Sequence, residues 1–396
     1  MFNYTLDYKY DRIREVLSDE DLGNIRHVIQ FEKHAEYFSS GRTCYYKLQK
    51  PVMIHGIKYE CLKIKGLGYG NVNGYWAFPG KSCFKRKEPH FGFNENGIVI
   101  PAYSDDAPFG GIVFSKAQNE VNNFITLFDN AIVSLFPIAL VKYNITFNGK
   151  PLACNIALCE DYPPIRMNRM LVDAHSLSGC EQSYFDKISA LLGLAGYHSS
   201  LQFQIWTEIA TKYANSIRKM NEAGLCLHSG GWSNIQFSLQ QQQIVLIDMD
   251  SVRSLSSFPE QIRALYALRD IISNLYRFFI NLYHPDTISL VTTDLLYQFE
   301  FPYYFLCGYF RNVPSDDLFK CSVKITRYYV HNCFTAIKAI EQKMLSLPSR
   351  EQKKMELRMF GFYDYCFRLL YPLFLTEDTS TKNENTLSRY VGLSDK

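Results

Sequence analysis

Residues 224–250 read GLCLHSGGWSNIQFSLQQQQIVLIDMD, and this stretch decides the fold that we expect for the whole chain. It follows a run from Gln202 to Ala223 in which apolar residues recur at steps of three and four, the spacing of an amphipathic helix. Gly224 is suited to end that helix, because glycine readily adopts the left-handed backbone conformation of a C-cap. The stretch therefore begins where a long helix ends.

Two apolar runs inside the stretch predict a β-hairpin. They are Asn234–Phe237 and Ile244–Ile247, with a turn at Gln240–Gln243, although Gln is not a favoured turn residue. Asp248 follows the second run directly, fourteen residues after Asn234. An Asn amide oxygen and an Asp carboxylate that converge from such a hairpin suit Mg²⁺, which prefers oxygen ligands. In the simpler alternative, Asn234 caps a turn and the Asp248 carboxylate lies in solvent.

This arrangement resembles the catalytic loop and metal-binding strand of protein kinases, small-molecule kinases and their relatives, where a loop ends in Asn and an Asp follows a short hairpin. The resemblance implies an α+β, bilobal kinase-like fold with a small β-rich N-terminal lobe and a large helical C-terminal lobe. It also implies ATP and Mg²⁺ as cofactors, with Asn234 and Asp248 as metal ligands. The run Ala267–Ser273 is similar to the kinase-fold helix whose Asp, here Asp270, braces the catalytic loop.

A second resemblance lies in the N-terminal half of the chain. Lys63 and Lys65 fall on one face of a strand in which polar and apolar residues alternate. The segment Leu62–Gly68 resembles the Lys-Gly-x-Gly segment of the selenoprotein O branch of kinase-like proteins, which transfer adenylyl groups. This resemblance implies that Lys65 contacts the nucleotide phosphates, with Lys63 as the second candidate, and it includes Gly66 and Gly68 in the cofactor-binding segment.

Glu120 is the best candidate for the ion-pair partner of this lysine. It lies in Lys116–Asn130, which has helical spacing, and the helix follows Gly110 and Gly111, where the backbone has room to approach a phosphate. The alternative is that the lysines lie exposed on an edge strand and that Glu120 faces solvent.

The sequence departs from kinases at the position of the catalytic base. The usual loop has an Asp five residues before the Asn, and here that position is Ser229. A serine cannot accept a hydroxyl proton as a carboxylate does. Asp250 is a candidate base or second metal ligand, and His228 is a further candidate base. The selenoprotein O branch also lacks the kinase Asp, so three readings stay open: phosphoryl transfer, adenylyl transfer, and a pseudokinase that binds without catalysis.

The distribution of residue types along the chain predicts three parts. Residues 1–160 form a β-rich nucleotide-binding lobe, with a helical N-terminal extension over residues 1–40. Residues 161–375 form a helical lobe that contains the catalytic-loop hairpin, and residues 376–396 form a polar tail. The acceptor of the transferred group, a protein or a small molecule, leaves no trace in the sequence.

Bulk composition excludes several classes of protein. Apolar residues make up 47% and charged residues 20%, which is typical of a folded globular protein. The net charge of +3 gives no nucleic-acid signal, and the sequence contains no uncharged apolar run of membrane-spanning length. None of the 11 cysteines forms a C-x-x-C motif, so we expect reduced thiols in the cytoplasm. An unrelated α+β hydrolase or interaction domain is the remaining alternative, but the sequence has no G-x-S-x-G elbow of a hydrolase.

Overall fold

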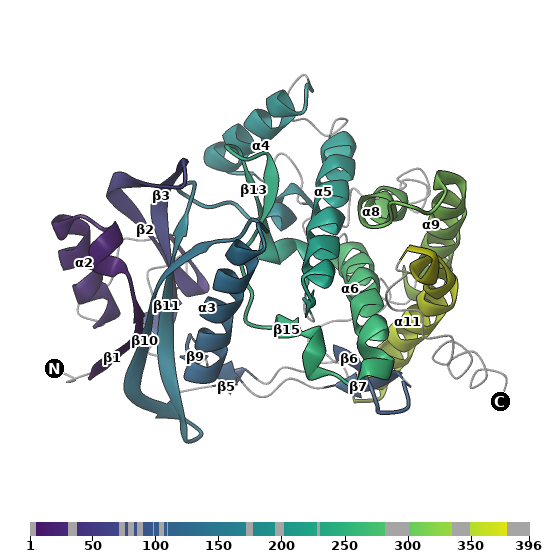
Figure 1. Cartoon of the computed structure of the whole chain (residues 1–396), viewed down its shortest axis with the longest axis horizontal. Helices are drawn as coiled ribbons and strands as arrows, with labels where there is room; N and C mark the ends of the chain where they lie inside the picture. The colour runs from purple at the N-terminus through teal and green to yellow at the C-terminus, as the bar shows by residue number, and fades with distance from the viewer. Residues whose placement is uncertain are drawn as a thin grey trace. The chain divides into compact units, whose positions relative to one another are not determined.

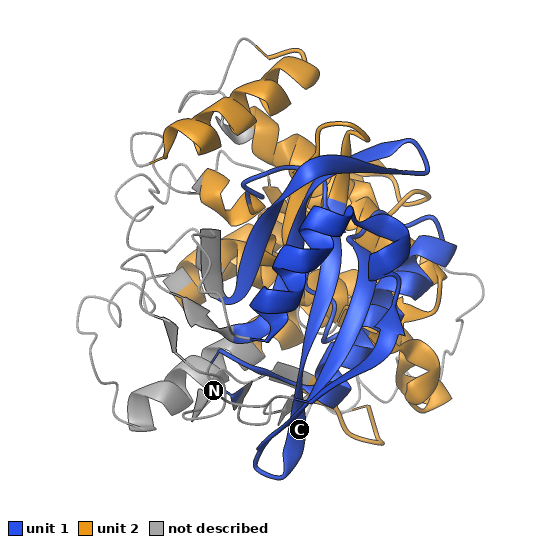
Figure 2. Cartoon of the chain, turned by 90° about the vertical axis from the view of Figure 1, so that its left-hand side faces the viewer, with its two compact units in different colours: residues 1–88, 103–165, 245–252 blue, residues 89–102, 166–244, 253–396 orange. Residues whose placement is uncertain are grey.

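The computed structural model of the chain describes most of its residues and divides them into two compact units, which Figure 2 shows in different colours. The described residues are 5–30, 38–70, 76–77, 83–84, 90–97, 99–102, 107–108, 110–171, 177–194, 202–227, 230–281, 301–334 and 349–377. Unit 1 comprises residues 1–88, 103–165 and 245–252, and unit 2 comprises residues 89–102, 166–244 and 253–396. The segment 245–252 therefore belongs to unit 1, although it is surrounded in sequence by unit 2.

An antiparallel sheet is the framework of unit 1. Its strands lie in the order β1 (Leu6–Asp11), β10 (Phe136–Phe147), β11 (Lys150–Cys159), β3 (Ile57–Gly70) and β2 (Phe38–Ile54). Two short strands extend it, since β4 (Trp76–Ala77) pairs with β3 and β9 (Ile112–Val113) pairs with β11. A tight Asn148-Gly149 turn joins β10 to β11, and both residues have positive φ angles, as this kind of hairpin turn requires.

The two faces of this sheet have different partners. Leu62 and Ile64 of β3 point to a core that also contains residues of the helices α1 (Ile13–Val16) and α2 (Asp19–Ile29). The other face packs against helix α3 (Phe114–Asp129), through a smaller core that includes Val121. Figure 1 shows α3 lying along β10 and β11. Because side chains alternate along a strand, Lys63 and Lys65 lie on the α3 face.

The predicted helical character of residues 1–40 is correct for α1 and α2. It is wrong at residues 38–40, which begin β2, and at Leu6–Asp11, which forms strand β1. This strand pairs with β10 at the edge of the sheet. Leu6 and Tyr10 are half-buried, whereas the charged residues between and beside them are exposed. Charged side chains are common on edge strands, and here they hid the alternation that marks a strand.

Gly66 is held in β3 by close packing against β11. Its φ angle is +106°, and a Cβ at this position would lie 2.4 Å from the carbonyl oxygen of Ala153 and 2.6 Å from Cγ2 of Ile112. A side chain therefore meets both backbone strain and a neighbour that cannot move aside. This packing explains the glycine without any ligand, so the assignment of Gly66 and Gly68 to cofactor binding stays a prediction.

We expect Gly66→Ala to lower the free energy of unfolding by about 2–5 kcal/mol, because strain and overpacking add. Urea denaturation followed by circular dichroism measures this change. Gly23→Ala is the matched control, since Gly23 lies in α2 with nothing within 4 Å of the added Cβ. In a helix this change should stabilise the chain by about 0.5–1 kcal/mol. Equal effects at the two positions would contradict the packing argument.

Unit 2 is mainly helical. Within its described residues, the helices of nine residues or more are α4 (Gly179–Leu191), α5 (Gln202–Glu222), α6 (Glu260–Asn281), α8 (Phe301–Tyr309), α9 (Ser315–Tyr329) and α11 (Ser349–Glu377). The aromatic rings of Trp232, Phe278 and Phe301 pack together at its centre. Among the helices that the structure describes, none has the length and hydropathy needed to cross a bilayer.

The elements predicted around residues 224–250 are present. Helix α5 coincides with the predicted amphipathic helix and is followed by Gly224, whose φ angle is +73°. The hairpin strands are β13 (Ile235–Ser238) and β14 (Gln243–Leu246), and Gln242 adopts a φ angle of +53° in the turn. The α+β class is therefore confirmed, with the small sheet-bearing part and the larger helical part of the kinase-like expectation. Residues 378–396, most of the predicted tail, lie outside the described residues.

Candidate functional site

A buried ion pair in unit 1 joins the sheet to helix α3. Lys65 on β3 is 1% exposed and Glu120 on α3 is fully buried, and Lys65 Nζ lies 2.8 Å from Glu120 Oε2. Lys63 Nζ lies 3.4 Å from the other carboxylate oxygen, and the amide of Asn155 donates to Glu120 Oε2 at 2.8 Å. The alternative of exposed lysines and a solvent-facing Glu120 is therefore wrong. Burial of such charges is costly unless each has partners, and here each has.

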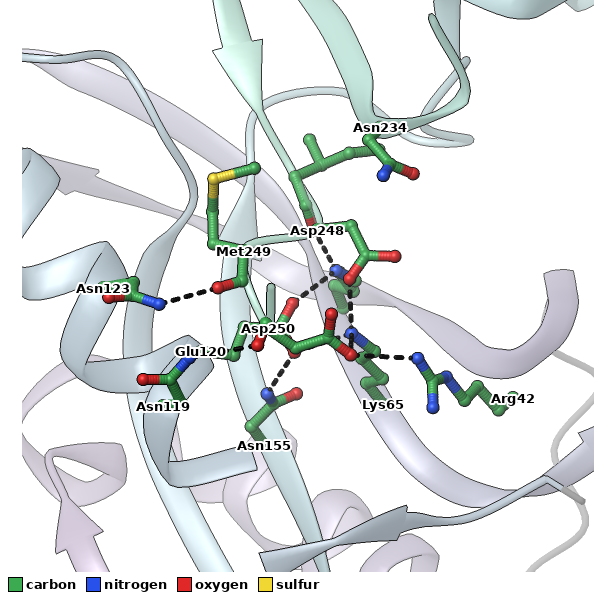
Figure 3. A network of polar contacts seen from close by, with 12 residues as sticks. Arg42, Lys65, Asn119, Glu120, Asn123, Asn155, Asn234, Asp248, Met249 and Asp250 are labelled. Carbon is green, nitrogen blue, oxygen red and sulfur yellow. Dashed lines mark hydrogen bonds and ion pairs between the residues drawn. The ribbon is translucent and has the colours of Figure 1, made fainter. Parts of the chain in front are cut away.

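The same lysine reaches the end of the hairpin segment. Lys65 Nζ donates to Asp248 Oδ1 at 2.6 Å and lies 3.4 Å from Asp250 Oδ2. Arg42 of β2 contacts Asp250 Oδ2 from the opposite side at 3.1 Å. Figure 3 shows these side chains converging. Three carboxylates thus surround one ammonium group, and the alternative in which the Asp248 carboxylate is only solvated is wrong.

Lys65 and Lys63 have different tasks in this arrangement. The Lys63 ammonium donates to the carbonyl oxygen of Ile247, the residue before Asp248, as well as contacting Glu120. Lys63 thus holds the main chain before Asp248, whereas Lys65 contacts the carboxylates of Asp248 and Asp250. This difference favours Lys65 over Lys63 as the residue that meets a ligand bound at Asp248.

Mutual attraction fixes the charge states of the cluster. Burial disfavours the charged form of Lys65, but Asp248, Asp250 and Glu120 outweigh it and hold the pKa of Lys65 well above its ordinary value. Burial likewise works against the Asp248 carboxylate, but Lys65, then Lys63 and Arg42, hold the pKa of Asp248 well below its ordinary value. At neutral pH Lys65 is therefore a cation and Asp248 an anion.

A magnesium ion fits the donor set that the chain offers here. Among the residues that the structure describes, no group of three or more His, Cys, Asp or Glu side chains forms a ready metal cage. Mg²⁺ rarely needs one, because it binds through one or two carboxylates and completes its shell with phosphates and waters. Asp248 uses Oδ1 for Lys65, and its side chain is still 23% exposed. Asp248 and Asp250 thus have the chemistry to hold the ion of a magnesium–nucleotide complex.

Sequence reasoning missed four polar residues that contact Glu120 or the segment of Asp248 and Asp250. They are Arg42, Asn119, Asn123 and Asn155. Arg42 is 208 residues away from its partner Asp250, so no local pattern predicts the contact. An asparagine on a helix or a strand matches no sequence motif either, so the other three residues were not predicted. The spacing of Asn123, three residues after Glu120 and four before Leu127, places it on the core-facing side of the helix, but this spacing does not identify its partner.

The loop after α5 is braced inside unit 2. The backbone N–H of Leu227 donates to the Asp270 carboxylate at 2.6 Å, and Asn221 donates to the same oxygen at 3.3 Å. Farther along, the N–H of Gly231 donates to the Tyr213 hydroxyl at 3.1 Å, and this hydroxyl donates to Asn274 at 2.7 Å. The loop is therefore fixed at both ends by buried side chains.

The loop residues themselves are described only in part. His228 and Ser229 lie outside the described residues, so their proposed roles stay predictions. Asn234 ends the short 3₁₀-helix η3 (Trp232–Asn234) in unit 2, where its N–H donates to the Gly231 carbonyl at 2.9 Å. Its pairing with Asp248 around a metal also stays a prediction.

We expect Tyr213→Phe to lower the free energy of unfolding by about 1–3 kcal/mol, because the buried N–H of Gly231 and the side chain of Asn274 each lose a partner. Chemical denaturation measures this value. Tyr304→Phe is the control, since Tyr304 is 37% exposed on α8. A loss no greater than the control's would show that the hydroxyl does not brace the loop.

Comparisons with known proteins give likenesses of overall structure. No family model matches the sequence, and no curated protein matches it. WaaP in complex with acyl carrier protein shares 10% identity, covers 88% of this chain and 98% of its own, and gives a TM-score of 0.35.

Two further solved structures are kinases by their descriptions. A Toxoplasma gondii rhoptry antigen kinase domain shares 11% identity over 76% of this chain and 84% of its own, with a TM-score of 0.25. A glucosamine kinase in complex with glucosamine, ADP and inorganic phosphate shares 8% identity over 100% of this chain and 94% of its own, with a TM-score of 0.28. The assignment of the site therefore rests on its own geometry.

Proposed function

We propose that the chain is an atypical kinase-like transferase that binds ATP with Mg²⁺ and moves a phosphoryl or adenylyl group to a protein or small-molecule acceptor. The observation that supports it most is the buried lysine, Lys65, which is shared between Glu120 on α3 and the acids Asp248 and Asp250. A single structural ion pair needs one carboxylate, whereas buried clusters of several charged groups with shifted pKa values are concentrated at functional sites.

Each residue has a task in this proposal. Asp248, with Asn234, holds the metal, and Asp250 is the second carboxylate beside it. Lys65 neutralises phosphate charge, and Glu120 keeps the lysine in place. Mg²⁺ bridges phosphate oxygens and offsets the charge that develops there during transfer. Residues 160–164 follow β11 at the end of unit 1, and in this proposal the adenine ring would hydrogen-bond to the backbone of this segment.

Labelled ATP tests the proposal and separates its two chemistries. The purified chain is incubated with Mg²⁺, candidate protein and metabolite acceptors, and ATP labelled at either the α- or the γ-phosphate. Transfer of γ-label alone identifies a phosphotransferase, and transfer of α-label identifies an adenylyltransferase like those of the selenoprotein O branch that Leu62–Gly68 resembles. Absence of both transfers, together with no magnesium-dependent nucleotide binding, would reject the proposed site.

A pseudokinase is the second candidate, favoured by one specific residue. Ser229 stands where the kinase loop has its Asp, and it cannot serve as a carboxylate base. In that case the chain binds nucleotide and acts by presenting a surface to a partner. A magnesium- and ATP-dependent rise in melting temperature, without transfer of either label, would support this candidate over the enzyme.

A further inference from the structure

Two asparagines on helix α3 hold the main chain that follows Asp248. The Asn119 amide donates to the carbonyl oxygens of Asp250 at 3.0 Å and Val252 at 3.1 Å. The Asn123 amide donates to those of Met249 at 2.8 Å and Val252 at 3.1 Å. We call Asn119 and Asn123 the amide clamp. Figure 3 shows both reaching from α3 toward the segment that carries the acids.

The chemistry of the clamp requires a primary amide at both positions. Each side-chain NH₂ has two hydrogens, and each uses both, so four hydrogen bonds cover three carbonyl groups. Residues 247–252 lie between the strands β14 and β15 (Arg253–Ser254), outside any strand, so no sheet partner satisfies these carbonyls. Met249 and Val252 are fully buried. The Met249 carbonyl also accepts from the Val252 N–H at 3.3 Å. Buried carbonyls with too few donors are costly, and the amides reduce that cost.

Asparagine has no local reason to occupy the interior of this helix. It is a modest helix former, because its side chain competes for backbone hydrogen bonds. Asn119 and Asn123 lie one helical turn apart and thus point the same way, toward the segment that they hold. Their contacts span 126 to 133 residues, which indicates a tertiary role and not a local capping role.

Helix α3 therefore controls Asp248 and Asp250 by two routes. Glu120, between the two asparagines, fixes Lys65, which contacts both acidic side chains. The amide clamp fixes the main chain on which these acids stand. A carboxylate that binds a metal must be held in orientation, and groups that orient ligands influence metal affinity strongly. One helix supplies both constraints.

We infer that Asn119 and Asn123 are positioning residues, which set the main chain of 249–252 so that Asp248 and Asp250 present their carboxylates to a divalent cation. This inference rests on the proposed nucleotide site for its cation, but the clamp itself is a property of the chain without any ligand. The two parts are therefore tested by separate measurements.

Hydrogen–deuterium exchange on the ligand-free protein tests the clamp. Asn119→Leu and Asn123→Leu keep the size of the side chain, add no charge and remove the amide donors. Asn122→Leu is the matched control, because Asn122 lies exposed on the same helix between the two clamp residues in sequence. We expect amides within residues 249–254 to exchange roughly tenfold or more faster in each clamp variant than in the control, since each loses two hydrogen bonds.

A magnesium titration tests the positioning role. The nucleotide-dependent rise in melting temperature is followed as Mg²⁺ increases, and half-saturating Mg²⁺ should rise roughly 10–100-fold in the clamp variants. At saturating Mg²⁺ the nucleotide affinity should stay close to that of the control. A merely structural role would lower the melting temperature and leave half-saturating Mg²⁺ unchanged.

The outcomes are separable. Exchange in both clamp variants at the rate of the control would overturn the clamp. Faster exchange with unchanged half-saturating Mg²⁺ would overturn the positioning role. If nucleotide with Mg²⁺ does not raise the melting temperature of the unsubstituted chain, the proposed function is wrong, and so is the positioning role. The hydrogen–deuterium exchange measurement would still show whether the clamp exists. If Asn123→Leu does not fold, the Asn119→Leu variant alone tests the clamp, because Asn119 is only half-buried and its replacement should be tolerated.

Discussion

Asp248→Ala should abolish the magnesium-dependent effect of ATP on the melting temperature and reduce any label transfer by at least about 100-fold. Removal of a group that merely orients a metal ligand lowers metal affinity or activity by about 10–100-fold. Removal of the ligand itself should lower them by at least about 100-fold. The fold should survive, because Lys65 keeps Glu120 at 2.8 Å and Asp250 at 3.4 Å as partners. The thermal scan with and without Mg-ATP measures binding, and the labelled-ATP assay measures transfer.

The control for this variant is Asp129→Ala. Asp129 is an exposed carboxylate at the end of α3 in the same unit, so its removal tests the effect of lost charge alone. Asp129→Ala should respond to Mg-ATP as the unsubstituted chain does. A full response to Mg-ATP in Asp248→Ala would show that the metal is held elsewhere, and the site would have to be reassigned.

Lys65→Met should have the largest effect on stability, a loss of about 3–5 kcal/mol in the free energy of unfolding. Removing one member of a buried ion network leaves the other charges without compensation. Glu120, fully buried, would keep only Lys63 at 3.4 Å and the amide of Asn155. The variant should also lose nucleotide affinity, because the phosphates lose their cation. Urea denaturation gives the first quantity and nucleotide titration the second.

Lys58→Met is the matched control for this prediction. Lys58 lies on the same strand and pairs with Glu60 at 2.7 Å, but both side chains are exposed, 48% and 36%. A surface pair of this kind contributes about 0–1 kcal/mol. The double variant Lys65→Met/Glu120→Gln should be more stable than Lys65→Met alone, since the uncompensated carboxylate is gone. If the loss of unfolding free energy in the double variant equals the sum of the losses in the two single variants, Lys65 and Glu120 are not coupled.

The sequence predicted those elements that depend on local patterns. The periodicity of residues 202–223 predicted α5, and alternation placed Lys63 and Lys65 on one face of β3. Glu120 was predicted as a partner because it lies on the one helical run in a β-rich region. Strand β1 was mistaken for helix, because its charged residues lie at an edge where one face is never buried.

The remaining site residues depend on tertiary contacts that no local pattern records. Arg42 meets Asp250, and Asn119 meets Val252, only after β2, α3 and the segment after β14 have folded together. A buried polar residue on a helix is recognisable only when its partner is known. The sequence thus predicted the acids and the lysine, and it could not predict which amides hold them.

The composition of unit 1 has a consequence for the order in which the protein is made. The strand that carries Lys63 and Lys65, and the helix that carries Glu120, leave the ribosome well before residues 245–252 do. Translation proceeds at roughly 5–20 residues per second, so the sheet waits for seconds before its acids are synthesised. A product released in that interval would contain the basic half of the site and none of Asp248 or Asp250. A chain that terminates between Ile165 and Val245 would lack both acids, and we expect it to lack the proposed magnesium–nucleotide binding.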